Sequence, residues 1–252
     1  MESPPRPWRR LLAAALLPLL WACDLLAPSY APEIDFAAAL ASEPGVDLWS
    51  FARHSVTGIN RNTGILVVVM LLAQHDWHRG DAPVESLLRN EPPWQVSDEA
   101  QRFLDAGCVS EITEFFLAVD DIGAVFQPGP LAALQAGRAE DVRPWSCYLR
   151  DNSVIETERV HRTRRTPMLF QLAQNDDLIP PEDHRRYFET LCERGYALDY
   201  LECAGVTHTQ GIFDSLPEQA WWLAERLAGA PIPAGDLCRQ RPAVTCSGNS
   251  PL

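Results

Sequence analysis

The sequence predicts an α/β fold in which helices flank a partial parallel sheet, and the order of its apolar segments carries that prediction. An apolar run at 167–172 is bounded by a proline and by polar turn residues, which is typical of a buried strand. A second run, at 196–201, is rich in tyrosine and leucine, and an amphipathic helical pattern at 182–195 separates the two. Because a crossover helix joins parallel strands, we expect both strands in one parallel sheet.

Each of these strands leads into a loop that carries an ionisable side chain. Asp176 and Asp177 follow the first strand, and His208 follows the second. An acid at this position has two interpretations: an Asx turn that only caps the strand, or a functional group at the carboxyl end of a sheet. Parallel strands bring such loops to the same edge, so we expect Asp176 and His208 to meet.

A last helix is predicted over 214–229, with Asp214 or Ser215 as its N-cap and Gly229 at its end. Its apolar residues at helical spacing predict that one side faces the sheet: Leu216, Ala220, Leu223 and Leu227.

Residues 166–238 resemble the C-terminal third of α/β-hydrolases, and within them the secreted bacterial and fungal lipases and esterases. The resemblance rests on Ala173-Gln-Asn-Asp176, Leu178-Ile-Pro180, His208 and Trp222-Leu-Ala-Glu-Arg226-Leu-Ala-Gly229. It implies that Asp176 is the acid and His208 the base of a catalytic triad. Ala173 stands where the family usually has glycine.

A second resemblance to the same lipases covers residues 21–48, WACDLLAPSYAPEIDFAAALASEPGVDL. It is similar to the end of the helix that follows the nucleophile, and it implies a strand at 34–41. The α/β-hydrolase core is therefore expected to comprise residues 21–46 and 166–238. A tail, 239–252, follows.

The nucleophile of such an enzyme is missing from the sequence. Ester hydrolases place their serine in a Gly-x-Ser-x-Gly turn, which exposes the hydroxyl beside the histidine. None of the serines here, nor any cysteine, has these flanking glycines. An acid and a base alone have no group to activate. We therefore expect this chain to be inactive by itself.

Residues 1–20 have two interpretations. Three arginines followed by an apolar run resemble an export signal, and Leu20-Trp-Ala-Cys23 resembles a lipoprotein cleavage site, which makes Cys23 a candidate lipid anchor. Alternatively, the segment is an accidental leader on a chain that has lost its N-terminal half, which we favour because the lipase-like sequence begins at about Trp21. The apolar run is about half of the roughly 20 residues that span a bilayer, so no membrane span is expected.

Composition indicates which kinds of partner and which cellular location the protein has. A net charge of −13 argues against nucleic-acid binding, and the only basic cluster, at 161–167, is interpreted as a solvated lead-in to the strand. Seven cysteines suit an exported protein with disulfides and suggest a secreted or cell-envelope location. No cofactor and no metal site is predicted: His75, His78 and Asp81 are interpreted as a polar loop rather than as metal ligands.

The region 47–165 is predicted to be a helical insertion similar to the cap that covers the acyl pocket of these lipases. An apolar run at 65–73 is interpreted as a buried helix within it. Its aromatic and apolar side chains are candidates for lining that pocket or, more simply, for packing the cap: Trp77, Trp94, Phe103, Phe115, Phe116 and Leu117.

The sequence thus predicts a carboxylic ester hydrolase of the lipase/esterase type, acting on an ester or lipid substrate, in a chain that lacks the nucleophile turn. An alternative is a non-catalytic exported lipoprotein that uses a hydrolase-like fold to bind acyl or other apolar ligands. A hydrolase of a neighbouring kind, such as a dienelactone or acyl-peptide hydrolase, would share Asp176 and His208. The cap-like helices favour the lipase.

Overall fold

The computed structural model describes residues 36–57, 61–78, 82–106, 114–115, 118–119, 121–156 and 166–248. These residues form two compact units: one spans 47–156, and the other combines 36–46 with 166–248. The expected leader, Cys23 and the basic cluster at 161–165 lie outside the described residues, as do residues 34 and 35 of the first expected strand.

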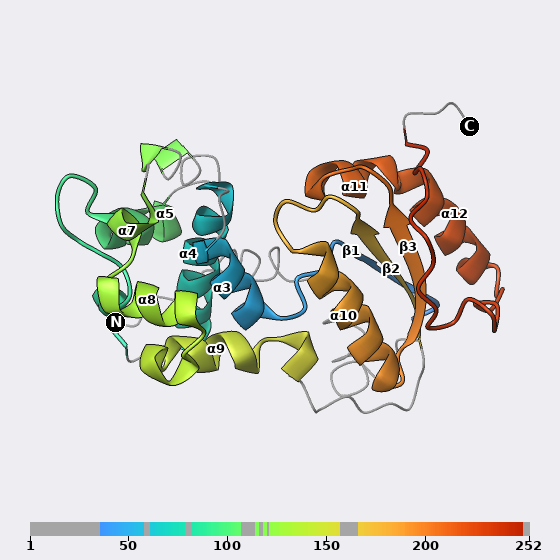
Figure 1. Cartoon of the computed structure of the whole chain (residues 1–252), viewed down its shortest axis with the longest axis horizontal. Coiled ribbons are helices and arrows are strands. Elements are labelled where there is room, and N and C mark those ends of the chain that lie inside the picture. The colour runs from blue at the N-terminus through green and yellow to red at the C-terminus, as the bar shows by residue number, and fades with distance from the viewer. Residues whose placement is uncertain are drawn as a thin grey trace. The chain divides into compact units, whose positions relative to one another are not determined.

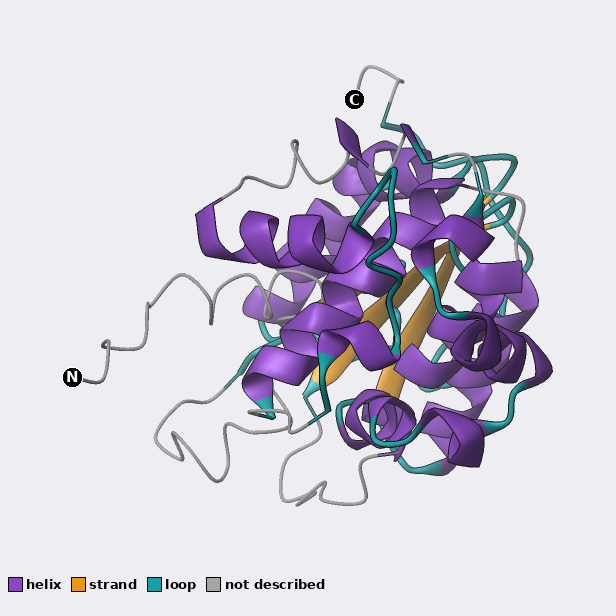
Figure 2. Ribbon diagram, turned by 90° about the vertical axis from the view of Figure 1, so that its left-hand side faces the viewer, coloured by secondary structure: helices purple, strands orange, loops and turns teal. Residues whose placement is uncertain are grey.

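The second unit is built on a three-stranded parallel sheet with the order β1-β2-β3. β1 (Ala39–Ser42) pairs with β2 (Pro167–Ala173), which pairs along its whole length with β3 (Ala197–Cys203). Figure 2 shows the strands side by side. The two strands predicted from the lipase-like block are therefore confirmed as parallel neighbours. β2 is buried on both sides, which is usual for a parallel strand covered by helices on both faces.

Helices cover each face of this sheet (Figure 1). α10 (Pro181–Glu193) packs on one face, where Phe188 contacts Phe170 of β2 and Tyr200 of β3 edge-to-face. α11 (His208–Asp214) and α12 (Leu216–Leu227) pack on the other face, where Trp222 hydrogen-bonds Asp199 of β3. Successive residues of each strand thus point to opposite faces of the sheet, one covered by α10 and the other by α11 and α12.

The predicted buried side of the last helix is wrong. Leu216 and Leu227 are exposed, and the helix instead buries Gln219, Trp222 and Arg226. The reason is the face of the sheet beneath it, which carries the buried carboxylate of Asp199 and needs hydrogen-bond donors. Of the two predicted N-caps, Ser215 is the N-cap of α12, and Asp214 is the last residue of the preceding helix, α11.

The chain after α12 closes the outer edge of β3. The backbone N–H groups of Cys238 and Val244 donate to the carbonyls of Leu198 and Glu202, at 2.8 and 2.9 Å. Two disulfides, Cys192–Cys238 and Cys203–Cys246, tie this segment to α10 and to β3. An edge covered in this way is protected from pairing with other chains. Residues 239–248 therefore belong to the same unit as the sheet.

The first unit contains helices and no strands in its described residues. Its longest helix, α4, has six consecutive buried residues, 67–72, which confirms the buried helix expected there. No helix of the described chain is long and apolar enough to cross a membrane. The elements of this unit are α3 (Leu48–Thr57), α4 (Arg61–Trp77), η1 (Val84–Ser86), α5 (Val96–Ala106), α7 (Ile122–Val125), α8 (Pro128–Ala136), η2 (Ala139–Val142), α9 (Trp145–Asp151) and η3 (Val154–Glu156).

Candidate functional site: an acid and a histidine at the sheet edge

Asp176 occupies the loop that follows β2, and its two carboxylate oxygens have different roles. Oδ1 accepts hydrogen bonds from the backbone N–H groups of Leu178 and Ile179, at 2.7 and 2.8 Å. Oδ2 lies 2.9 Å from Nδ1 of His208. The two interpretations of this acid are therefore compatible: one oxygen caps the turn, and the fixed turn aims the other oxygen at the histidine.

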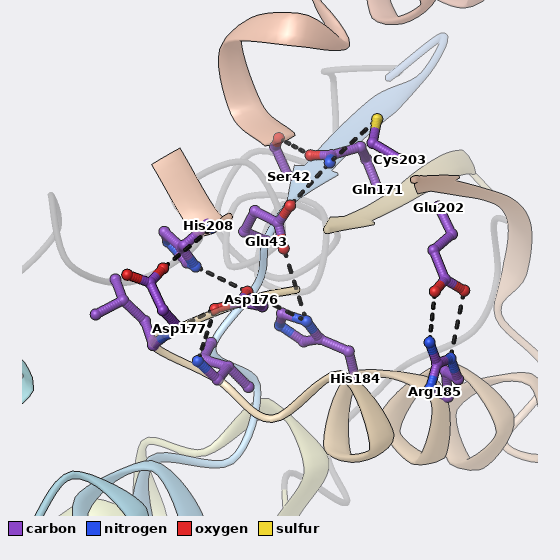
Figure 3. A network of polar contacts seen from close by, with 12 residues as sticks. Ser42, Glu43, Gln171, Asp176, Asp177, His184, Arg185, Glu202, Cys203 and His208 are labelled. Atoms are coloured by element: carbon purple, nitrogen blue, oxygen red, sulfur yellow. Dashed lines mark hydrogen bonds and ion pairs between the residues drawn. The ribbon is translucent and has the colours of Figure 1, made fainter. Parts of the chain in front are cut away.

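His208 begins α11 instead of lying within a loop. Thr207 caps this helix in a capping box with Gln210, which fixes the backbone from which the imidazole projects. The neighbouring Asp177 accepts a hydrogen bond from the His208 backbone N–H, at 3.2 Å. Figure 3 shows the arrangement of the two acids around the histidine. Because β2 and β3 are parallel neighbours, the structure brings Asp176 and His208 together as expected.

Burial differs sharply between the two partners. The Asp176 side chain is fully buried, whereas the His208 side chain is 16% exposed. Burial raises the pKa of Asp176, but the hydrogen bond and the positive charge of His208, together with the nearby His184, outweigh it and hold this pKa below its ordinary value. An ionised Asp176 fixes the proton of a neutral His208 on Nδ1, which leaves Nε2 as the basic nitrogen.

Two further residues surround the far side of Asp176, and the sequence analysis did not predict either. Glu43 directly follows β1, and His184 lies in the first turns of α10. Both side chains are completely buried. The signal for His184 was its spacing: it precedes Leu191 by seven positions and Tyr187 by three, on the apolar side of the helix. The signal for Glu43 was its place two positions after the strand expected at 34–41.

Both of these buried groups favour their neutral forms. Burial raises the pKa of Glu43 to about 10, and the negative charge of Asp176 acts in the same direction. Burial also lowers the pKa of His184 to about 4, against the opposing pull of Asp176. Glu43 holds a left-handed backbone conformation, with φ of 47°, which is uncommon for a residue with a side chain. Such strain persists only where the surrounding structure enforces it.

Other residues considered in the sequence analysis lie elsewhere. His75 Nε2 contacts the carbonyl of Ala82, at 2.8 Å, and His78 Nε2 contacts the amide of Asn152, at 2.7 Å, while Asp81 lies outside the described residues. Among the aromatic pocket candidates, Trp77 is 62% exposed and Trp94 packs edge-to-face on Phe115. The side chain of Phe103 and the residues Phe116 and Leu117 lie outside the described part.

Comparisons with known proteins identify the fold. No protein-family model matches the chain, and no curated protein matches it. Among solved structures it is similar to lipase A of Candida antarctica, with a TM-score of 0.63 and 15% identity over 92% of this chain and 50% of that one. The closed state of the same lipase gives a TM-score of 0.64 and 16% identity, over 92% and 52% of the two chains.

The rice cell wall degrading esterase LipA from Xanthomonas oryzae is also similar, with a TM-score of 0.56 and 14% identity over 83% of this chain and 53% of that one. The chain thus spans about half the length of the solved structures it matches. The fold is α/β-hydrolase-like, as the sequence predicts: a parallel sheet flanked by helices, in the manner of lipases and esterases.

Proposed function

We propose that the sheet unit carries the acid and base of a carboxylic ester hydrolase of the lipase/esterase type. The observation that carries the proposal is the pairing of Asp176 Oδ2 with His208 Nδ1, at 2.9 Å, on loops that follow adjacent parallel strands. In this role His208 Nε2 takes the proton of a serine hydroxyl and later passes it to the leaving alcohol, while Asp176 orients the ring and stabilises its charged form. The helical residues 47–156 then correspond to the cap.

The serine itself is not supplied by a Gly-x-Ser-x-Gly turn within these 252 residues. The two oxyanion-hole amides of such enzymes come from that turn and from a loop that precedes it. Because the base then has neither a nucleophile nor an oxyanion hole to work with, the 252-residue chain alone is expected to lack ester turnover. The two disulfides support an oxidising, extracellular or cell-envelope location for it.

Two experiments test this proposal. Hydrolysis of p-nitrophenyl butyrate and palmitate by the purified chain is compared with that of His208→Ala. Turnover that disappears in the variant would show that the chain is a complete catalyst and that its predicted inactivity is wrong. Sequencing the DNA upstream of the Met1 codon and translating all three frames tests the hydrolase assignment itself. A Gly-x-Ser-x-Gly preceded by alternating strands and helices is expected.

A second candidate is a non-catalytic exported lipoprotein that binds apolar ligands, which the missing nucleophile turn favours. It predicts metabolic labelling with palmitate that is lost in Cys23→Ser, and no Gly-x-Ser-x-Gly in the upstream DNA. The hydrolase proposal predicts the opposite result for the upstream DNA, so the two candidates separate on one measurement.

A further inference from the structure

Three buried side chains from separate parts of the chain converge beside His208, and one of them is the acid of the acid–histidine pair (Figure 3). Glu43 comes from the end of β1, Asp176 from the loop after β2, and His184 from α10. None of the three side chains is exposed. One ligand atom from each residue lies within 4.8 Å of the other two. The cluster therefore has the residue types and the compactness of a metal site.

His184 Nδ1 lies too far from both carboxylates for a hydrogen bond. His184 Nδ1 lies 3.7 Å from Glu43 Oε2 and 3.6 Å from Asp176 Oδ2. Neither ring nitrogen of His184 has a hydrogen-bond partner in the described chain, and neither does Glu43 Oε2. Buried polar atoms are nearly always partnered, and each that is not costs about 1–3 kcal/mol. A group that sits between these atoms would satisfy them together.

The spacing of these atoms fits a metal ion. Two ligand atoms that each lie about 2.1 Å from one tetrahedral zinc ion are roughly 3.4 Å apart. The measured separations of 3.6 and 3.7 Å are close to that value. Two ionised carboxylates balance the charge of a divalent cation, and an imidazole nitrogen favours a transition metal over calcium or magnesium.

We propose that Glu43, Asp176 and His184 form a binding site for a divalent transition-metal ion of the zinc type. Glu43 and Asp176 each supply a carboxylate oxygen, and His184 supplies Nδ1. The site shares Asp176 with the acid–histidine pair, because Oδ2 lies 3.6 Å from His184 Nδ1 and 2.9 Å from His208 Nδ1. The inference therefore extends the site on which the proposed function rests, and metal binding is measured separately from ester turnover.

Neighbouring groups hold these ligands in place. Gln171 Nε2 donates to Glu43 Oε1, at 2.9 Å, and leaves Oε2 directed at His184. The turn amides hold Asp176 through Oδ1, so that Oδ2 lies between Nδ1 of His208 and Nδ1 of His184. Gly211 leaves room for the Glu43 carboxylate, since a Cβ at that position would overlap Oε1. Supporting contacts of this kind orient the ligands of metal sites.

Cobalt binding tests the proposal. The full chain with Cys147→Ser, which removes the free thiol of the described part, is stripped with chelator and titrated with Co²⁺ and then Zn²⁺. We expect visible absorption bands without a thiolate charge-transfer band, and their loss when Zn²⁺ displaces Co²⁺. Glu43→Gln is expected to bind Co²⁺ at least about 100-fold more weakly, since ligand loss exceeds the effect of losing a supporting contact.

The matched controls are a histidine and an acid outside the cluster. His54→Ala and Asp177→Asn are expected to keep the same affinity and the same spectrum as the parent. If Glu43→Gln is not folded by circular dichroism, His184→Gln replaces it. Equal binding by the parent and the folded variant, binding only with thiolate bands, or no binding at millimolar Co²⁺ or Zn²⁺ would each overturn the proposal.

Discussion

The sheet buries two groups of carboxylates that differ in how fully they are hydrogen-bonded. On β3, both oxygens of Glu202 have donors, from Arg185 and from the Tyr200 hydroxyl. Both oxygens of Asp199 also have donors, from Trp222 Nε1 and from Arg241.

At the carboxyl ends of β1 and β2 the situation is the reverse. Glu43 Oε2 and both nitrogens of His184 have no hydrogen-bond partner in the described chain, and Glu43 adopts a strained backbone conformation. A fully partnered network holds elements together, whereas a buried network with unmet groups and strain marks a functional site. The comparison therefore favours a structural role for Asp199 and Glu202, and it supports the metal site proposed at Glu43, Asp176 and His184.

The largest expected effect on stability comes from the β3 cluster, which comprises Asp199, Glu202 and their hydrogen-bond donors. It follows when one of the cations of this cluster is removed. Arg185→Met leaves the buried Glu202 carboxylate without its charged partner, and we expect the free energy of unfolding to fall by about 3 kcal/mol. The control is Arg138→Met, because Arg138 and Asp141 are both about half exposed. Its expected loss is below about 1 kcal/mol. Equal losses in urea denaturation would contradict a structural role for the β3 cluster.

Filling the space beside Glu43 is expected to have the next largest effect. A Cβ at Gly211 would lie 2.9 Å from the Ala173 Cβ and closer still to Glu43 Oε1. We expect Gly211→Ala to lower the free energy of unfolding by about 1–3 kcal/mol. Gly129→Ala, where a Cβ meets no atom within 4 Å, should be neutral or slightly stabilising. A stable Gly211→Ala would show that the close packing around the carboxylate is not required.

Replacing Glu43 itself is expected to stabilise the metal-free protein at alkaline pH. The pKa of Glu43 is about 10 in the folded state against an ordinary 4.5, so the folded state holds the proton where the unfolded state has lost it. Stability therefore declines as pH rises from about 4.5 towards 10. Glu43→Gln mimics the protonated acid and removes this decline.

We expect Glu43→Gln to raise the free energy of unfolding at pH 8, with chelator present, by at least about 1.4 kcal/mol, the equivalent of one pKa unit. The gain should shrink towards pH 4.5. The exposed Glu193→Gln should show no such pH-dependent gain. A loss of stability in Glu43→Gln at pH 8 would mean that Glu43 is ionised in the folded protein and would remove the contrast with the β3 cluster.

For the acid–histidine pair the expected change is in the protonation of one ring and not in stability. Asp176→Asn can retain the turn through Oδ1, but its amide then donates to Nδ1 of His208. We expect the neutral ring to change from the Nδ1–H to the Nε2–H tautomer. Because a hydrogen bond to a charged group is worth about 1.5–3 kcal/mol, its loss should change the ratio of the two tautomers about tenfold or more. Ring ¹⁵N chemical shifts measure the tautomer. An unchanged tautomer would show that Asp176 does not orient His208.

Local patterns were sufficient to predict the elements and one pair of site residues. β2, α10 and β3 follow from apolar periodicity, and the parallel crossover brings the Asp176 and His208 loops to one edge. The sequence allowed that inference because the two residues follow the two strands of a single strand–helix–strand unit. The two disulfides, by contrast, are not predictable from spacing, because their pairing depends on the path of the C-terminal segment along β3.

The tertiary structure decided which polar groups are buried and what surrounds them. Apolar spacing predicted that Leu216 and Leu227 face the sheet, but the buried Asp199 requires a donor and turns Trp222 inward instead. Likewise Glu43 and His184 lie 141 positions apart in the sequence, so no local pattern brings them together. Burial is a property of the assembled layers, and it is burial that shifts the pKa values of Glu43 and His184.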